Sequence, residues 1–382
     1  MVLGREVGAL QVAINCVKEF GGSAKAALDF QRALGGYTLS FTSREYMSFI
    51  SNSKAIHLPT GNNPISRHYS IPKLGAINRW IRKNDSRPGL VVIHGLYRYH
   101  AQWASRWARK QGIPYWVVLN GALDPWVFTY RTFQKRLWMK AVGQRILNEA
   151  ACVIAATRRE AEKAAPFLRD CRVSVVHLPV SKIDTSDRQA IRMEVRKSLG
   201  IPSQARILLF LGRLHPMKRI GEMIESVHFA GVPDVHLVVV GTSSEELSIE
   251  SCKEQVRLLG ARNIHMVGPA FGADKNRWLL GSDGFVSLSF RENFNYAAAD
   301  AMIAGLPVIL SPGNDLCLEL DSIGAGWTLN SFERDEEIDA IQQFSRSSVN
   351  DLATMGAAGT QWAISNLSEE KFESCTQKLW QQ

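Results

Sequence analysis

Residues 285–313, FVSLSFRENFNYAAADAMIAGLPVILSPG, are the most informative segment of the sequence. An apolar strand ends at Phe290, the polar turn RENFN follows, and residues 296–304 form an alanine-rich predicted helix. Gly305 favours the end of that helix, and Pro307 prevents its continuation before the next apolar strand, 308–310. Strand, helix and strand in this order predict a βαβ unit of a parallel sheet.

Short apolar runs alternate with helical patterns along all 382 residues, which predicts an α/β protein with two doubly wound domains. We expect an N-terminal domain over 1–180, a polar linker over 181–189 and a C-terminal domain over 190–361. A C-terminal helical segment, 362–382, is expected to pack back on the first domain. The expected strands are 10–16, 37–42, 90–94, 115–119, 152–156 and 173–178, then 207–211, 236–240, 264–267, 284–288 and 308–310.

The composition is that of a globular protein, with 46% hydrophobic and 21% charged residues. No window holds the ~18 consecutive apolar residues of a spanning helix, and the first 22 residues lack a cleavage signal and are interpreted as a first strand. We therefore expect a cytoplasmic protein. The six cysteines have no CxxC spacing, which argues against a zinc site or a disulfide framework.

The charge is unevenly distributed. Residues 1–180 hold 26 Lys and Arg against 10 Asp and Glu, a net charge of +16, whereas residues 181–382 hold 19 against 26, a net charge of −7. Thirteen of the cations lie in residues 79–145, among tryptophans. This mixture favours a peripheral contact with an anionic membrane surface, or an anionic acceptor such as a lipid diphosphate. A merely soluble basic surface is the alternative, and nucleic acid is not expected because no binding motif accompanies the charge.

Two segments carry candidate chemistry. Glu292 and Asp300 are eight residues apart, one in the turn and one in the helix, so both can face the carboxyl edge of the sheet. Free backbone N–H groups at the start of that helix are suited to a diphosphate. In FLGRLHPMKRI, residues 210–220, Arg213 and Lys218 follow a buried strand and are also suited to phosphate. A lone Arg-x4-Lys spacing usually belongs to a solvated surface, but its place one half-domain before the acidic segment favours a phosphate site.

With these motifs the chain resembles family 4 of the retaining GT-B glycosyltransferases. The resemblance rests on GRL followed by Lys218, on the acidic pair, on ENF, ADAMIAGLPVI and MGAAGTQWAISNLSEEKF, and on GGS, VIHGLY and LNGALDPW in the first half. It therefore spans essentially the full length. It implies two Rossmann-like domains that face each other across a cleft, with the donor bound by the C-terminal one.

The resemblance also implies roles for individual residues. Arg213 and Lys218 would neutralise the diphosphate of a UDP- or GDP-sugar as the glycosidic bond breaks, Glu292 would lie near the sugar ring, and Asp300 would hold the ribose hydroxyls. Further expected donor-binding residues are Gly21, Gly22, Gly268, Asn293, Phe294, Asn295 and Tyr296; the expected acceptor-side residues are His94, Asn120 and Asp124. Neither a metal nor another cofactor is expected. The acceptor would be a glycan or a lipid-linked acceptor, in polysaccharide or cell-envelope biosynthesis.

Two positions depart from the family pattern. Asp300 stands where the family usually has glutamate, and Asn120 where it commonly has histidine, so a role that needs imidazole charge is lost there. These departures keep open a catalytically weakened protein that binds nucleotide sugar or glycan without turnover. A GT-B enzyme of other chemistry, such as an epimerase, is less favoured by the motifs. Asp124 is also a candidate helix N-cap before Pro125, and His94 a satisfied strand-end histidine.

Overall fold

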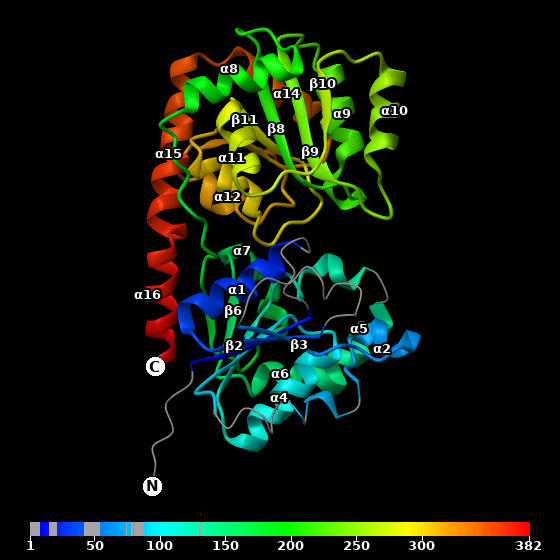
Figure 1. The fold of residues 1–382 in the computed structure, drawn as a ribbon, viewed down its shortest axis with the longest axis vertical. Helices are drawn as coiled ribbons and strands as arrows, with labels where there is room; N and C mark the ends of the chain where they lie inside the picture. The colour runs from blue at the N-terminus through cyan, green and yellow to red at the C-terminus, as the bar shows by residue number, and fades with distance from the viewer. Residues whose placement is uncertain are drawn as a thin grey trace. The chain divides into compact units, whose positions relative to one another are not determined.

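In the computed structural model, which describes residues 8–14, 21–41, 54–73, 75–77, 79, 87–129 and 132–382, the chain divides into two compact units. Unit 1 comprises residues 1–179 and 370–382, and unit 2 comprises residues 180–369. Figure 1 follows the chain through both units. Residues 181–189, the expected linker, fall within unit 2, where irregular backbone gives way to a helix at Arg188.

Unit 1 is built on a parallel sheet of order β3-β2-β1-β4-β5-β6-β7. Alternation of short apolar runs with helices produces this topology, because parallel neighbours need a crossover between them. Its strands are β1 Leu10–Ala13, β2 Tyr37–Ser40, β3 Ala55–His57, β4 Val91–His94, β5 Tyr115–Val118, β6 Cys152–Ala155 and β7 Val173–Val175. Its longer helices are α1 Gly22–Leu34, α2 Pro64–Tyr69, α4 Tyr99–Gln111, α5 Thr132–Trp138, α6 Gln144–Asn148, α7 Arg158–Ala164 and α16 Glu369–Trp380.

Unit 2 repeats the plan with a parallel sheet of order β10-β9-β8-β11-β12-β13. The strands are β8 Arg206–Arg213, β9 Val235–Thr242, β10 Ile264–Val267, β11 Gly284–Ser287, β12 Val308–Leu310 and β13 Gly326–Thr328. The helices are α8 Arg188–Leu199, α9 Ile220–Phe229, α10 Ile249–Leu259, α11 Gly272–Gly281, α12 Tyr296–Ile303, α13 Cys317–Leu320, α14 Arg334–Arg346 and α15 Val349–Leu367.

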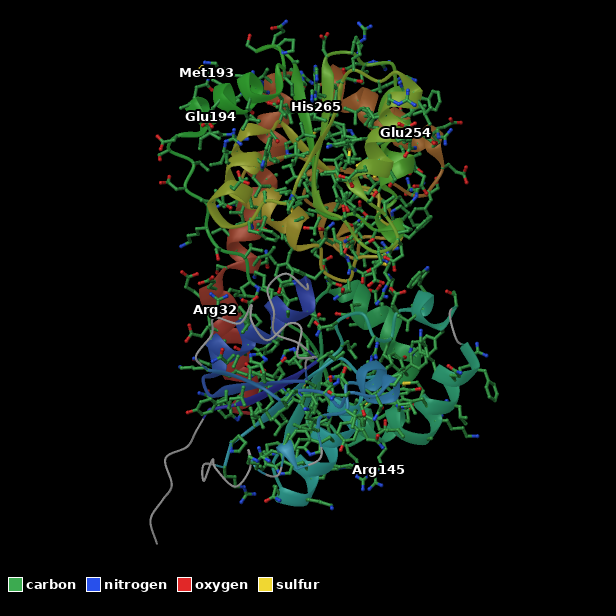
Figure 2. All side chains as sticks on the ribbon, turned by 45° about the vertical axis from the view of Figure 1, so that its right-hand side comes forward. Arg32, Arg145, Met193, Glu194, Glu254 and His265 are labelled. Carbon is green, nitrogen blue, oxygen red and sulfur yellow. The ribbon has the colours of Figure 1, made fainter. Side chains whose placement is uncertain are left out.

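Helices cover both faces of the sheet in unit 2. In Figure 1, α8, α11, α12 and α15 lie to one side of it and α9 and α10 to the other. The central strands are therefore buried on both faces, and their residues read as near-continuous apolar runs. Polar and flexible side chains point outward, as Met193 on α8 and Glu254 on α10 do in Figure 2.

The last two helices, α15 and α16, are consecutive in sequence but belong to different units. Helix α15 belongs to unit 2, whereas α16 belongs to unit 1 from Glu370 onward. Within unit 1, the ring of Phe372 on α16 meets that of Phe30 on α1 edge-on, at 4.9 Å between centroids. The chain therefore passes between the units twice, near residues 180 and 369.

Candidate functional site

The cationic loop of unit 2 follows β8. Arg213 is exposed at the end of that strand and, within the part of the chain that the structure describes, makes no side-chain hydrogen bond or ion pair. A single 3₁₀ turn, Pro216–Lys218, comes next, and His215 caps it by accepting the N–H of Met217 at Nδ1, 3.1 Å away. Burial, with help from Arg213 and Lys218, lowers the pKa of His215. The imidazole is therefore neutral near pH 7, and the two permanent cations dominate the loop.

The acidic turn lies directly against this loop. The Lys218 ammonium pairs with the Glu292 carboxylate, which also accepts a hydrogen bond from Ser289 Oγ at 3.1 Å. The backbone N–H of Phe290 donates to the carbonyl of Met217 at 2.9 Å. Both side chains of the ion pair are mostly shielded, at 19% and 13% exposure, so their attraction is weakly screened. Two of the predicted site residues, Lys218 and Glu292, are thus brought together at the carboxyl edge of the sheet.

Backbone and side-chain hydrogen bonds fix the turn that carries Glu292. The Glu292 N–H donates to the carbonyl of Gly313 at 2.8 Å, and its carbonyl accepts from Asp315 N at 2.8 Å. Asn295 caps α12 by accepting Ala298 N–H at 3.2 Å, and its amide donates to Asn314 Oδ1 at 2.7 Å. The side chain of Asn295 therefore holds the turn rather than facing solvent. Helix α12 therefore begins at the edge of the sheet where β11 ends.

The other predicted donor residues surround this edge. Asp300, on α12, pairs with Lys275 Nζ of α11 at 2.7 Å. This contact was not predicted from the sequence, because no motif includes Lys275. Phe294 is buried, and its ring packs edge-on against Tyr296 at 4.9 Å. The remaining predicted residues of this unit are Asn293, which is half-buried in the turn, and Gly268, which follows β10 with open space where a side chain would begin.

Unit 1 holds the other predicted residues. Gly21, at φ 89°, precedes α1, and Gly22 begins it; a Cβ on Gly21 would meet no described atom within 4 Å. His94 ends β4 but is 3% exposed, with Nε2 3.0 Å from Gln11 Oε1. Burial, followed by the nearby His100, lowers the pKa of His94 to about 3. His94 is therefore a neutral, buried strand-end histidine.

Asn120 and Asp124 lie in the LNGALDPW segment of unit 1. Asn120 has φ 49°, a conformation that asparagine tolerates. The next N–H, that of Gly121, is bound by the buried carboxylate of Glu160. Asp124 Oδ1 accepts Trp126 N–H at 2.9 Å, which confirms the N-cap alternative, and Oδ2 accepts from Lys163 at 2.8 Å. Both carboxylate oxygens of Asp124 are thus engaged inside unit 1.

The described residues contain no group of three or more His, Cys, Asp or Glu side chains arranged to hold a metal ion. No helix among them is long and apolar enough to span a bilayer.

Comparison with known proteins defines the class of this chain. The family model "Glycosyl transferases group 1" matches residues 191–362, and "Glycosyl transferase 4-like domain" matches residues 52–179. Among solved structures, sucrose-phosphate synthase from Thermosynechococcus elongatus has a TM-score of 0.77 at 18% identity, over 99% of this chain and 98% of that one. Anabaena HepE in complex with UDP and glucose has a TM-score of 0.76 at 16% identity, over 97% and 98%. The two parallel sheets with their helices are therefore the two Rossmann-like domains of the GT-B fold.

The two family models together match most of the chain, and the chain belongs to the GT-B glycosyltransferases. A curated relative, the D-inositol 3-phosphate glycosyltransferase of Mycolicibacterium gilvum, is 26% identical over 239 residues, which is 58% of this chain. That of Mycobacterium marinum is 25% identical over 247 residues, 63% of this chain. The matched region spans about half the length of these curated relatives, 52% in both cases.

Proposed function

We propose that this protein transfers a sugar from a nucleotide diphosphate sugar to a glycan or lipid-linked acceptor, with retention at the anomeric carbon. The observation that carries the proposal is the direct contact between Lys218 and Glu292, one from each of the two motifs, at the carboxyl edge of the unit 2 sheet. Such an edge is where open α/β sheets bind their ligands. The proposal rests on this geometry together with the membership of the glycosyltransferase family.

In this proposal the cations stabilise the leaving group. Arg213 is unpaired within the described part of the chain, so its guanidinium is available to donate to phosphate oxygens as negative charge develops on them. Lys218 supplies a second charge from beside Glu292. The N-terminus of α12 lies at the same edge and favours negative charge, so it binds phosphate or sugar oxygens.

The two acidic residues, Glu292 and Asp300, bind the sugar and the ribose of the donor. The Glu292 carboxylate, held by Ser289, binds a sugar hydroxyl or stabilises positive charge at the anomeric carbon. Asp300 binds the ribose hydroxyls, and its contact with Lys275 keeps the shorter carboxylate in place. Gly268 borders the base. The reaction proceeds without a metal ion.

The proposal also includes the chemical class of the donor and of the acceptor. HepE has been solved in complex with UDP-glucose, and the curated relatives are named for D-inositol 3-phosphate. UDP- and GDP-sugars are thus the first donors to test, and an anionic acceptor agrees with the charge of +16 on residues 1–180. Polysaccharide or cell-envelope assembly is the setting that we propose.

A panel of UDP-, GDP- and ADP-sugars, incubated with the protein with and without membrane extract, tests this function. We expect nucleotide release from one donor, increased by the extract and unchanged when EDTA is added. Saturable thermal stabilisation by a nucleotide with no sugar released from any donor would contradict turnover and support the alternative, a binding protein without transfer. Loss of release in EDTA, restored by a divalent cation, would contradict the metal-independent reaction.

We also propose that unit 1 contacts an anionic membrane through an exposed stripe of α5 and the π-helical turn after it, Met139–Gly143. Phe133, Arg136, Leu137 and Lys140 recur at the i, i+3, i+4 and i+7 spacing of one helical face, and all four are exposed. Residues 125–148 contain no Asp or Glu. Apolar side chains between cations are typical of segments that lie in the interface of anionic lipid.

Sedimentation with vesicles of phosphatidylcholine, with and without phosphatidylglycerol, tests the membrane contact. We expect binding to the anionic vesicles, and Arg136→Gln with Lys140→Gln to weaken it about 10-fold or more, since each cation near such a surface contributes about 1 kcal/mol. Lys197→Gln with Lys253→Gln, which removes two exposed cations of unit 2, is the control that leaves binding unchanged. Equal binding to both kinds of vesicle would contradict the proposal.

A further inference from the structure

Arg219 immediately follows Lys218 and combines two unfavourable properties. Its backbone is left-handed, at φ 55° and ψ 43°, a region that non-glycine residues seldom occupy. Its charged side chain is only 6% exposed. A strained backbone and a buried charge at one residue require that the surrounding structure hold them in place.

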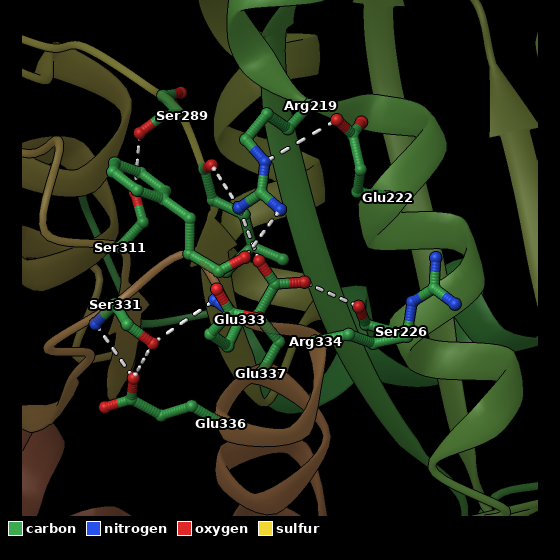
Figure 3. A network of polar contacts seen from close by, with 12 residues as sticks. Arg219, Glu222, Ser226, Ser289, Ser311, Ser331, Glu333, Arg334, Glu336 and Glu337 are labelled. Carbon is green, nitrogen blue, oxygen red and sulfur yellow. Dashed lines mark hydrogen bonds and ion pairs between the residues drawn. The ribbon is translucent and has the colours of Figure 1, made fainter.

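The side chain of Arg219 is held by residues of two helices and two loops, shown in Figure 3. The guanidinium pairs with the fully buried Glu337 of α14 and donates to the carbonyl of Phe332 at 3.2 Å. Glu337 in turn accepts a hydrogen bond from Ser226 of α9 at 2.6 Å. The carbonyl of Leu288, just after β11, lies 3.4 Å from Arg219 Nη1. Both terminal nitrogens of the guanidinium are therefore hydrogen-bonded within unit 2, whereas Nε has no hydrogen-bond partner among the described residues and lies 3.6 Å from Glu222 Oε1.

Two aromatic rings complete this arrangement. The guanidinium carbon lies 4.9 Å from the ring centroid of Phe290 and 5.3 Å from that of Phe332, and the two ring centroids are 5.2 Å apart. Arginine in particular makes such contacts, because its planar cation can stack on a ring while its N–H groups still donate in their plane. Phe290 belongs to the segment that leads to Glu292.

Three consecutive residues of the cationic loop thus contact the segment 288–292, which leads into the acidic turn. Met217 accepts the N–H of Phe290, Lys218 pairs with Glu292, and Arg219 contacts Leu288 O and the ring of Phe290. The contacts of Met217 and Arg219 thus lie on either side of the Lys218–Glu292 ion pair in sequence. A buried ion pair contributes little net stability compared with apolar packing, so stability alone does not explain a charged, left-handed residue here.

We propose that Arg219 is a positioning residue: anchored by Glu337, Phe290 and Phe332, it fixes where Lys218 lies relative to Glu292. This rests on the proposed function, in which Lys218 meets the charge that develops on the leaving diphosphate. A cation displaced by about 1 Å from its productive position loses much of its effect, on the order of 100-fold in rate. Arg219 touches neither substrate nor reacting atom, so it acts through Lys218.

Arg219→Lys tests the proposal because lysine keeps the charge and loses the planar contacts with both rings and the fork of donors. The matched control is Arg196→Lys. Arg196 is also buried, pairs with Asp283 and donates to Gly281 O at 2.9 Å, but these partners precede β11 at the opposite edge of the sheet. We expect Arg219→Lys to lower kcat about 10- to 100-fold and Arg196→Lys to leave it within about 2-fold, at a similar loss of Tm in both variants.

The effect of Arg219→Lys on kcat should depend on Lys218 if Arg219 positions that residue, but not if the substitution only destabilises the protein. In a Lys218→Ala background, Arg219→Lys should lower kcat further by less than about 3-fold, because the residue it positions is absent. An unchanged kcat in the single variant, or an equal loss in both backgrounds, would overturn the proposal. If Arg219→Lys does not fold, Phe332→Leu, at a partly exposed position, removes one ring and keeps the ion pair.

Hydrogen exchange tests the same inference without any turnover. Amides of residues 214–220 and 288–293 should exchange faster in Arg219→Lys than in wild type, and at wild-type rates in Arg196→Lys. If no donor turns over, the proposed function fails while this comparison still decides the positioning role. Unchanged exchange in both segments would refute it.

Discussion

At the scale of single residues, the site is built from charges that are already paired. Glu292 pairs with Lys218 and Asp300 with Lys275, so each predicted acid lies beside a cation. Arg213 has no such partner within the described part of the chain. The proposed diphosphate site therefore combines the Arg213 guanidinium with two cations that carboxylates hold in place.

If Lys218 stabilises the leaving group as proposed, Lys218→Ala should lower turnover by about 100-fold or more, because the charge that it removes is needed most as that group departs. The donor KM should change less, since ground-state contacts through α12 remain. Steady-state kinetics with the active donor measure both. Lys253→Ala, at an exposed lysine of α10, is the control with unchanged kinetics, and an unchanged kcat for Lys218→Ala would refute the role of Lys218.

Burial of His94 predicts a pH dependence of stability. Its pKa is about 3 in the folded protein and about 6.5 when unfolded, so between these values the unfolded chain binds the extra proton. This contribution to stability is fully present above pH 6.5 and is lost as the pH falls toward 3, at about 1.4 kcal/mol per pH unit. His94→Gln should therefore lose less stability than wild type between pH 7 and pH 5, by about 2 kcal/mol. Urea unfolding at the two pH values measures the difference; equal losses would contradict it.

At the scale of elements, the sequence predicted most strands to within two residues at each end. β10 and β12 coincide with the predicted ranges, because their apolar runs are bounded by polar or helix-breaking residues. The strands β3 and β13, three residues each and only half-buried, were missed because so short a segment has no recognisable period. Strand β7 was predicted, but it ends at Val175, three residues before the predicted end at residue 178.

Site residues, like strands, were predicted where a local sequence pattern marks them and missed where none does. Arg213, Lys218, Glu292 and Asp300 stood out because they occupy fixed places in strand–turn–helix motifs. Lys275 and Glu337 did not, because each is brought to the site by packing of a distant helix, across 25 and 118 residues of sequence. Local sequence does not encode such long-range contacts.

Helix α15 packs closely on α12, the helix that carries Asp300. This packing predicts that alanine substitutions at two glycines of α15 change stability very differently. A Cβ on Gly356 would lie 2.2 Å from the carbonyl oxygen of Gly305, whereas one on Gly359 would first meet side-chain atoms at 3.3 Å or more. Gly356→Ala should cost about 1–3 kcal/mol, through overpacking against backbone. Gly359→Ala should be near neutral, because the gain in helix propensity offsets a small shift. Chemical denaturation compares the two; equal stabilities would contradict this packing.

At the scale of the whole molecule, the C-terminal helix contributes to the core of a unit that begins 370 residues earlier. Phe372 is 4% exposed and contacts Phe30, and Trp380 lies against Gly89. Unit 1 therefore requires the end of the chain as well as its beginning.

Phe372→Ala should destabilise unit 1 by about 3–5 kcal/mol, the usual cost of removing a buried phenylalanine. Hydrogen exchange, read separately over residues 87–129 and 206–346, should show faster opening in the first range alone. Phe271→Ala, at a 61% exposed position in unit 2, is the control that leaves both unchanged. Equal acceleration in both ranges would contradict the assignment of α16 to unit 1.

The double passage of the chain has a further consequence for proteolysis. Residues 181–187 lie outside any helix or strand and are largely exposed, so trypsin can reach Lys182. One nick there yields two fragments, but the longer one carries α16, whose Phe372 is buried in the shorter one. The nicked protein should elute as one species in native size exclusion and separate only in denaturant, like a protein reassembled from complementary fragments.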